Sequence, residues 1–408
     1  MEYRLDELFD LQMGKTPARK NPEYWNSNDH KWISIADLSK CEKYITETKE
    51  HISSIAVQES GISEIPANTV IMSFKLSIGK TAITKEPIYS NEAIMSFRDK
   101  GVTPLLPDYI YYMFSGRDWS KGSNTAVMGT TLNKATLSQI RIYVHAYEDQ
   151  KRIVELLDKV SSIISKRKQE LVELDDLIKA RFVEMFGDPQ INPFGWDIVN
   201  ISEVVGGKVS NGFFAKRDDY ADDGNVSILG VANIVNRMYS KVDELPRTNA
   251  DYKDIEKFGV KYGDMLFCRS SLVAEGIGKA SIIPEDVKEN ILFECHVIRL
   301  PLDLSKCVPE FMQTLSTMDF FRNQVIAQSK TATMTTIGQD GILKTDIILP
   351  PIDRQREFYD FINQIDKSKL LSGCRFFHSW APANRDNLNH VGVPRRKTKD
   401  LRGGRRQQ

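Results

Sequence analysis

The chain has 408 residues, of which 41% are hydrophobic and 27% charged, and this composition suits two globular domains and excludes a disordered or fibrous protein. Its 55 Lys and Arg balance its 55 Asp and Glu, which excludes a protein that binds nucleic acid through overall positive charge, so any DNA-binding surface has to be local. It contains no apolar run of the ~18 residues that a membrane span needs, and no leader with a basic and then an apolar part, so we expect a cytoplasmic protein.

The predicted elements mix short strands with helices. Runs rich in β-branched and aromatic residues predict strands, and Pro at the first turn predicts the starts of two helices. The pattern therefore favours a mixed α/β (α+β) fold class. In chain order, we expect strands at 32–35 and 69–72, a helix at 107–114, a strand at 140–144 and a long helix, then strands at 226–229 and 264–267, a helix at 309–315, a strand at 347–349 and a final helix.

The long helix is the clearest element in the sequence. From about Gln150 to Phe186 the chain contains no Pro or Gly, and its apolar residues form a heptad-like stripe between charged faces. Such a helix would be roughly 54 Å long and has to bury its stripe against another helix. The final helix begins equivalently at 353, but the likeness stops after about Leu371, where Gly and Pro follow. The residues expected to form a helix seam and to dock a partner are Ile153, Leu156, Leu157, Val160, Ile163, Ile164, Leu171, Leu174, Ile178, Phe358, Ile362 and Ile365.

The sequence also repeats itself. Ordered landmarks of the first 150 residues recur about 200 residues later, at offsets that only grow along the chain. This series predicts two diverged copies of one domain with small insertions. The matched landmarks are Leu5 and Ile198, Gly14 and Gly207, Asp37 and Asn233, Gly79 and Gly278, Glu92 and Glu294, Pro107 and Pro309, and Gln150 and Gln355.

These motifs resemble those of one known family. Residues 14–25 (GKTPARKNPEYW), followed by WISIADL at 32–38, are similar to the opening of a target-recognition domain of type I restriction-modification specificity (S) subunits. The resemblance extends over roughly residues 1–371. Further matching segments lie at 131–133, 140–144, 150–154 and 349–355.

The resemblance implies two homologous target-recognition domains joined by long antiparallel coiled-coil helices. It implies a non-catalytic protein that reads a bipartite double-stranded DNA sequence and docks DNA methyltransferase subunits, joined by a restriction endonuclease subunit for cleavage. Any cofactor would then belong to those partners. The implied parts are a first target-recognition domain at 1–149, a spacer helix at 150–187, a second target-recognition domain at 188–352, the start of a second spacer helix at 353–371, and a basic, disordered tail outside the family pattern at 372–408.

DNA recognition requires particular side chains in each copy. Arg and Lys pair with guanine, Asn and Gln pair with adenine, and hydroxyls and cations contact phosphates. In the first copy, the residues with this chemistry are Lys15, Thr16, Arg19, Lys20, Lys75, Ser77, Lys80, Asn124, Thr130, Asn133 and Lys134. In the second copy, they are Lys208, Asn211, Lys216, Arg217, Arg269, Ser270, Ser271, Lys279, Lys330, Thr331, Thr333, Thr335 and Gln339.

Two other interpretations stay open. Asp37 with Glu47 and Lys49 resembles the acidic pair and lysine of a metal-dependent nuclease, so the runner-up is a stand-alone DNA-acting enzyme with a coiled-coil linker. The third interpretation is a truncated specificity subunit whose short second helix impairs assembly. The two Gly-Lys-Thr motifs lack the earlier glycine of a phosphate-binding loop, and the six His and five Cys show no metal-ligand spacing. We therefore expect no nucleotide, metal or catalytic site.

Overall fold

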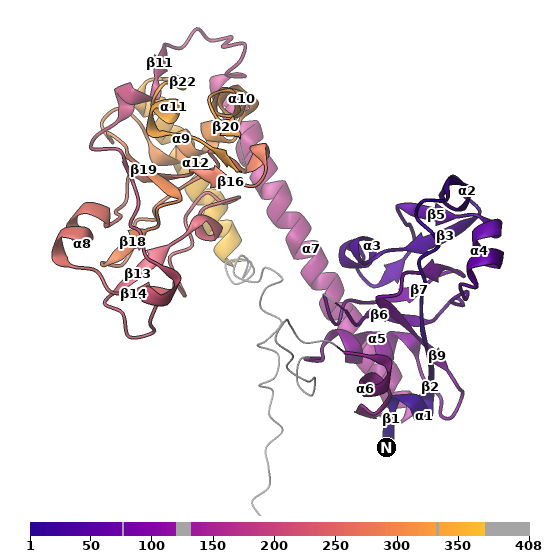
Figure 1. Cartoon of the computed structure of the whole chain (residues 1–408). Helices are drawn as coiled ribbons and strands as arrows, with labels where there is room; N and C mark the ends of the chain where they lie inside the picture. Colours follow the sequence, from indigo (N-terminus) through magenta and orange to yellow (C-terminus); the bar gives the residue numbers. More distant parts are fainter. Residues whose placement is uncertain (76, 120–131, 332–333, 372–408) are drawn as a thin grey trace, which may run out of the picture. The chain divides into compact units, whose positions relative to one another are not determined.

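A computed structural model describes residues 1–75, 77–119, 132–331 and 334–371. The candidates Asn124, Thr130 and Thr333, the side chain of Arg217 and the predicted tail at 372–408 lie outside the described residues. The described chain divides into a first unit, residues 1–166, and a second unit, residues 167–371. The division falls within α7 (Tyr147–Phe186), the long helix in Figure 1. The domain boundaries expected from the sequence stay a prediction, and no helix in the described part of the chain is long and apolar enough to cross a membrane.

The first unit contains two sheets and a short strand pair. Its larger sheet has the strand order β2-β9-β6-β7-β4, and its smaller sheet has the order β5-β3-β8. The strands are β1 (Glu2–Arg4), β2 (Phe9–Met13), β3 (His30–Ile33), β4 (Tyr44–Ile45), β5 (Glu50–Ile52), β6 (Val70–Ser73), β7 (Thr81–Thr84), β8 (Tyr89–Ser90), β9 (Ile94–Asp99) and β10 (Arg141–Tyr143), which pairs with β1. The helices are α1 (Leu5–Leu8), α2 (Pro22–Trp25), α3 (Ile35–Lys40), α4 (Ser54–Ser60), α5 (Pro107–Ser115) and α6 (Lys134–Ser138).

The second unit repeats most of this topology, although its larger sheet has four strands where the first unit has five. Its sheets have the orders β12-β19-β15-β17 and β14-β13-β18, its terminal pair is β11-β22, and a further sheet has the order β16-β21-β20. The strands are β11 (Ile198–Asn200), β12 (Ser210–Asn211), β13 (Val226–Leu229), β14 (Arg247–Thr248), β15 (Asp264–Cys268), β16 (Ser270–Ser271), β17 (Ala280–Ile282), β18 (Ile291–Phe293), β19 (Val297–Pro301), β20 (Lys330–Thr331), β21 (Thr335–Thr336) and β22 (Asp346–Ile348). The helices are η1 (Ile201–Val204), η2 (Arg217–Asp219), η3 (Val231–Asn233), α8 (Tyr252–Phe258), η4 (Ala274–Gly276), α9 (Pro309–Ser316), α10 (Asp319–Ala327), α11 (Gln339–Leu343) and α12 (Ile352–Leu371).

This shared topology confirms the mixed α/β class and the internal repeat, but the predicted register is wrong at its start. Leu5 N donates a hydrogen bond to Ile140 O, and Ile201 N donates the equivalent bond to Thr345 O. Leu5 therefore corresponds to Ile201, at an offset of 201 − 5 = 196, and not to Ile198.

Later in the chain the match of Glu92 with Glu294 is also displaced by one residue. Asn91 N and Glu294 N donate to the equivalent carbonyls of Ile33 and Leu229, so Asn91 is the counterpart of Glu294.

The counterpart of Gly14 is Gly212, not Gly207. A Cβ added at Gly14 would lie 2.2 Å from Ser90 O, and one added at Gly212 would lie 2.2 Å from Phe293 O. Both positions need glycine because two backbone segments approach closely there. At Gly207 the nearest atoms to an added Cβ belong to the Pro301 side chain, at 3.4 Å. The Gly-Lys pair at 207–208 thus has the same sequence as the pair at 14–15, but it lies at a different place in the fold.

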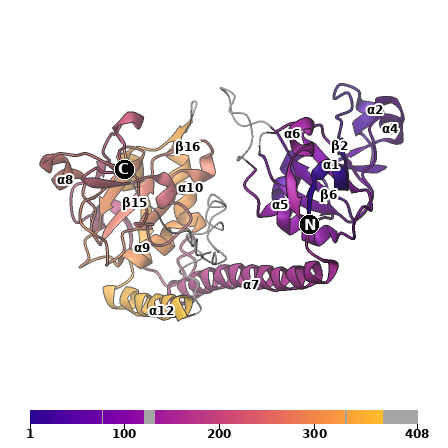
Figure 2. The ribbon, with the colours of Figure 1, turned by 90° about the horizontal axis from the view of Figure 1, so that it is seen from below.

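The core of the second unit centres on four phenylalanine rings. Phe182 and Phe186 from α7 contact Phe311 from α9 and Phe358 from α12, with ring centroids 5.0–5.6 Å apart. Figures 1 and 2 both show α12 beside the C-terminal part of α7. Burying these rings removes a large apolar area from water, so this part of α7 belongs to the core of the second unit.

One buried glutamine joins each unit to its following helix. Gln150 Oε1 accepts from Leu106 N, and its Nε2 donates to Pro104 O and His145 O, all at 3.0 Å. Gln355 makes the equivalent bonds with Val308 N, Lys306 O and Pro350 O at 2.8–3.2 Å. Each side chain satisfies three backbone groups that lie away from water. The predicted match of Gln150 with Gln355 is confirmed by these bonds.

Replacing Gln355 with Leu should destabilise the second unit by about 2 kcal/mol or more. Leucine fits the volume but leaves Val308 N–H and two carbonyls without partners, and each unsatisfied buried group costs about 1–3 kcal/mol. Denaturant unfolding of the full chain would measure this loss. Gln364→Leu, at an exposed position of the same helix, is the matched control. Equal stability of the two variants would contradict the assigned role.

The two copies differ in one polar cluster beside these helices. In the first unit Lys43 Nζ lies 2.6 Å from carboxylate oxygens of both Asp108 and Asp158. Burial alone would lower the pKa of Lys43, but the two carboxylates outweigh burial and raise it.

In the second unit Glu310 takes the place of Asp108, at an offset of 310 − 108 = 202, the same as for the Pro107 and Pro309 helix starts. Glu310 accepts one bond from the Tyr239 hydroxyl at 3.2 Å, while its Oε2 has no partner among the described residues. Burial raises the pKa of the Glu310 carboxyl to about 7.

This raised pKa predicts that the second unit loses stability as pH rises toward neutral. Between the unfolded pKa near 4.3 and the folded value of about 7, the folded state holds a proton that the unfolded chain releases, so the free energy of unfolding falls with increasing pH. Glu310→Gln should remove this pH dependence and be the more stable protein above pH 7. Hydrogen exchange of the β15 and β19 amides at a series of pH values reports on this unit. Glu256→Gln, at an exposed position of the same unit, should keep the wild-type slope, and a slope unchanged in Glu310→Gln would contradict the assignment.

Candidate nucleic-acid interface

The small sheet β16-β21-β20 gathers several predicted DNA-binding residues of the second unit. Ser271 pairs with Thr335, which pairs in turn with Thr331. The Thr331 and Thr335 hydroxyls lie 3.0 Å apart. Lys330 and Thr331 are exposed, whereas Thr335 is buried and supports the sheet from within. The sheet therefore presents hydroxyl and ammonium groups from chain segments about 60 residues apart on one short surface.

Arg269 is held at the edge of this sheet. Its backbone N donates to His296 O at 2.9 Å, and its carbonyl accepts from Ile337 N at 3.0 Å. Its Nη1 donates to Cys295 O at 3.3 Å. The half-buried guanidinium is thus oriented by one bond, and its other N–H groups make no hydrogen bond with the described residues. An oriented arginine with spare donors is the side chain that pairs most often with guanine.

Exposed apolar residues adjoin the same sheet, and the sequence analysis missed them. Leu272 is 82% exposed and Val273 58% exposed, directly after β16, while Met334 is partly exposed before β21. Apolar side chains in a polar setting can contact the methyl group of thymine. In the sequence Leu272 and Val273 form an apolar pair between two polar stretches. This pattern is the signal that could have predicted their exposure beside the sheet.

Several candidates of the first unit are engaged within the protein. The Arg19 guanidinium stacks over the Trp25 ring at 3.8 Å and forms an ion pair with Glu50. Lys15 Nζ donates to Ser60 O, and the Thr16 hydroxyl donates to Glu92. The Thr16 hydrogen bond is the main reason that the pKa of Glu92 is lowered. These contacts order the 14–25 segment, so its polar groups are held in fixed positions.

Asn133 has a structural role that accounts for its identity. Its side chain accepts from Thr136 N at 2.9 Å and caps the N-terminus of α6. Lys134 follows as an exposed first helical residue. The pattern Asn-x-x-Thr before a short helix could have predicted this cap.

The remaining candidates are dispersed over the two units. Lys279 Nζ donates to Asn236 Oδ1 at 2.7 Å, and Asn211 Oδ1 is buried without a partner among the described residues. Lys75 lies 5.3 Å from the centre of the Phe74 ring. The residues whose side chains are exposed or half-buried, with no other described side-chain hydrogen bond, are Lys20, Ser77, Lys80, Lys208, Lys216 and Gln339.

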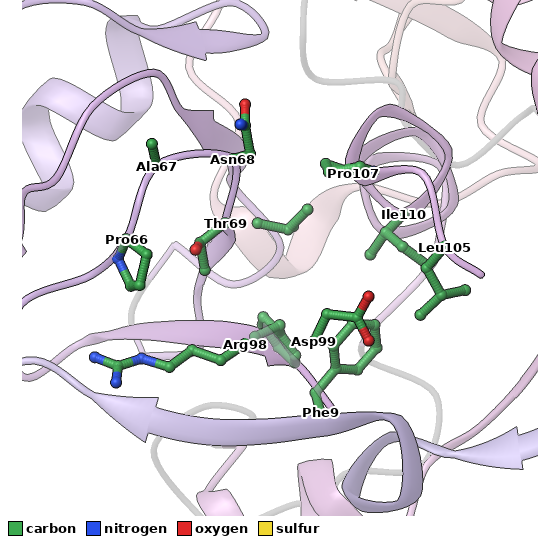
Figure 3. Close-up of a pocket in the computed structure, with 12 residues that line it drawn as sticks. Phe9, Pro66, Ala67, Asn68, Thr69, Arg98, Asp99, Leu105, Pro107 and Ile110 are labelled. Carbon is green, nitrogen blue, oxygen red and sulfur yellow. The ribbon is translucent and has the colours of Figure 1, made fainter. Parts of the chain in front are cut away.

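A cleft of about 250 Å³ in the first unit lies apart from these candidates. Figure 3 shows it between the segment 66–69, the start of α5 and the strand that carries Arg98 and Asp99. Arg98 donates to Glu64 O. Most of the other lining side chains are apolar, and the polar ones are Asn68, Thr69 and Asp99. None of the predicted DNA-binding residues lines this cleft.

The nuclease-like residues have structural partners. Asp37 forms a capping box with Ser34 at the start of α3, and its Oδ1 accepts from Lys49 N at 3.2 Å. Glu47 lies 3.6 Å from Lys31. Among the described residues, no three His, Cys, Asp or Glu side chains gather as metal ligands would. The described geometry therefore gives the nuclease interpretation no support.

The predicted helix-seam residues lie in three different surroundings. Ile153 packs against the core of the first unit. Exposed positions at Leu156, Val160 and Ile163 form one ridge at i, i+4 and i+7 of α7. Leu157 and Ile164 are half-buried, and Leu171 is buried. The residues that pack together in the second unit are Leu174, Ile178, Phe358, Ile362 and Ile365.

Comparison with known proteins finds similar sequences in one family. Residues 1–174 match the family described as type I restriction modification DNA specificity domain. The chain is similar to the type I restriction enzyme MjaIX specificity subunit of Methanocaldococcus jannaschii, with 22% identity over 386 residues that cover 89% of this chain and 85% of that protein. It is also similar to the HindI specificity subunit of Haemophilus influenzae, with 27% identity over 195 residues that cover 44% of this chain and 40% of that protein.

A solved structure of the type I restriction-modification S subunit from M. genitalium is also similar, with 9% identity, a TM-score of 0.45 and coverage of 93% of this chain and 92% of that one. The sequence matches agree with the motifs at 14–25 and 32–38 and with the duplicated topology of the two units. Residues 1–174 therefore match a type I restriction modification DNA specificity domain, and the relatives that the chain resembles over most of its length or over one half are type I restriction enzyme specificity subunits.

Proposed function

We propose that this chain is the sequence-specific DNA-binding specificity subunit of a type I restriction-modification complex, that it reads a bipartite target, and that it docks methyltransferase and endonuclease subunits. The observation that supports this proposal most directly is the duplicated topology, because two related units suit two separate stretches of one duplex. The family match and the named relatives support it independently. The chain itself catalyses no reaction in this proposal, so the purified protein should neither cleave nor methylate DNA.

In this proposal the second unit reads DNA with the surface around β16-β21-β20. Arg269 supplies oriented donors for a base edge, and Lys330 supplies charge for phosphates. Leu272 and Val273 supply apolar contact. In the first unit the ordered segment 14–25 carries the equivalent chemistry, with Lys20 exposed and Arg19 held over Trp25.

Arg269→Ala should weaken binding to the cognate sequence about 10- to 100-fold, because a good arginine–base pair contributes about 1–3 kcal/mol of discrimination. Binding to unrelated DNA should change little, since phosphate contacts supply most non-specific affinity. Methylome sequencing of a host with and without this chain would provide the cognate sequence, and fluorescence anisotropy would measure both affinities. Lys253→Ala, at an exposed position on α8, is the control. Equal cognate affinity of the two variants would remove Arg269 from the readout.

The exposed ridge of α7 is the proposed docking surface for a helix of a partner subunit. Leu156, Val160 and Ile163 present contiguous apolar area to solvent within the described chain, and an amphipathic partner helix would cover such a ridge. Substitution of buried Leu171 or Ile178 would not test docking, because it would damage the fold itself.

Ile163→Asp combined with Leu156→Asp should abolish co-purification with the methyltransferase subunit while leaving the thermal unfolding of the free chain nearly unchanged. The reason is that burying a charge in an apolar interface costs several kcal/mol, whereas both positions face water in the free chain. Lys168→Asp, at an exposed position of the same helix, should still co-purify. A double variant that assembles normally would place the docking surface elsewhere.

A further inference from the structure

The second unit contains a cavity of about 430 Å³ whose walls carry an unusual excess of positive charge. It lies between the C-terminal part of α7, the segment 236–238, β17, α9 and α10. Lys179, Arg237, Lys279 and Arg322 line it, and Asp175 is the single carboxylate among its lining residues. This volume is in the range of small-molecule sites, roughly 300–1,000 Å³.

The first unit serves as an internal comparison for this region. Ile83 N donates to Lys43 O and Ile282 N donates to Met238 O, so Glu42 and Arg237, one residue earlier in each copy, are counterparts. Tyr111 O–H donates to Glu42 O at 3.1 Å, and Gln313 Nε2 makes the equivalent bond to Arg237 O at 3.2 Å.

The second copy has therefore exchanged an acid for an arginine, and tyrosines for smaller side chains. Tyr111 corresponds to Gln313, and the next residue, Tyr112, corresponds to Thr314. Loss of two phenol rings opens space, and the charge reversal from Glu42 to Arg237 makes that space favourable for an anion. Both Gln313 and Thr314 are buried and line the cavity.

One cation of the wall has an unused donor. Arg322 Nη2 donates to Glu275 O and Ile277 O, while its Nη1 is buried without a hydrogen-bond partner among the described residues. Leaving a buried donor of this kind unpaired is unfavourable, and an anion would remove that penalty through a charge-assisted bond. Of the other cations, Lys279 donates to the neutral Asn236 at 2.7 Å, and Lys179 lies 3.9 Å from Asp176. Four cations and one carboxylate, Asp175, line the cavity, so its wall keeps a net positive charge.

We propose that this cavity is a binding site for a small phosphate-bearing ligand of about nucleotide size, with Arg237, Arg322 and Lys279 as the cations that hold the phosphate. Gln313 and Thr314 form the neutral wall for the rest of the ligand. The proposal does not depend on DNA recognition, because the ligand enters a concave site in one unit, whereas duplex DNA is contacted by side chains on an exposed surface.

Equilibrium dialysis of the full chain with inorganic phosphate, AMP and ATP as separate probes would test this site. We expect at least one probe to bind with a stoichiometry of one ligand per chain. Arg237→Glu and Thr314→Tyr restore the residues of the first copy, and each should weaken that binding at least tenfold. Arg237→Gln provides a milder variant in case Thr314→Tyr does not fold. Lys288→Glu makes the same charge change as Arg237→Glu at an exposed position of the same unit and should bind like the wild type.

Three results would overturn the proposal. One is the absence of binding by all three probes at millimolar concentration. Another is unchanged affinity in both Arg237→Glu and Arg237→Gln. The third is displacement of the probe by a short duplex of unrelated sequence, with the same variants losing duplex affinity in parallel, which would make the cavity a contact for backbone phosphates. That third result would leave the proposed DNA-binding function intact, so the two proposals fail separately.

Discussion

Each unit depends on a buried glutamine at the point where a strand passes into a long helix. Gln150 and Gln355 each accept one backbone N–H and donate to two carbonyls. Without these bonds, three polar groups beside the helix start would be buried unpaired, and a shift of the helix against the sheets would be less costly. These hydrogen bonds fix the direction of each helix. Ile153 in the first unit and Phe358 in the second then pack against the core of their own unit.

Much of this architecture could be predicted because apolar runs, and proline at the first turn of a helix, are local sequence signals. The strands at 69–72 and 264–267 and the proline-started helices α5 and α9 lie within one or two residues of their predicted positions. The error at Gly207 had a physical cause. Glycine is required where backbones approach closely, and that approach is set by long-range pairing, which two identical letters do not reveal. The sheet β16-β21-β20 was not predicted because its strands have two residues each, too few for an alternating pattern.

The candidate interface was less predictable than the fold. Residue chemistry selected Arg19, Asn133 and Arg269 alike, yet the structure gives them an aromatic stack, a helix cap and an oriented surface position. Each outcome depends on a partner distant in sequence or on a turn conformation. Donor and acceptor chemistry does not predict the exposed Leu272 and Val273, although apolar contact also contributes to base recognition.

The divergent cluster beside the two helices gives the duplicated units different sensitivities. Lys43 holds Asp108 and Asp158 through partly exposed ion pairs, which dissolved salt screens. Its counterpart region buries Glu310, whose proton is lost near neutrality. Increased ionic strength therefore weakens the ion pairs of the first unit, and increased pH lowers the stability of the second unit. Two units of similar topology can thus be loosened independently, so a change of medium need not weaken both at once.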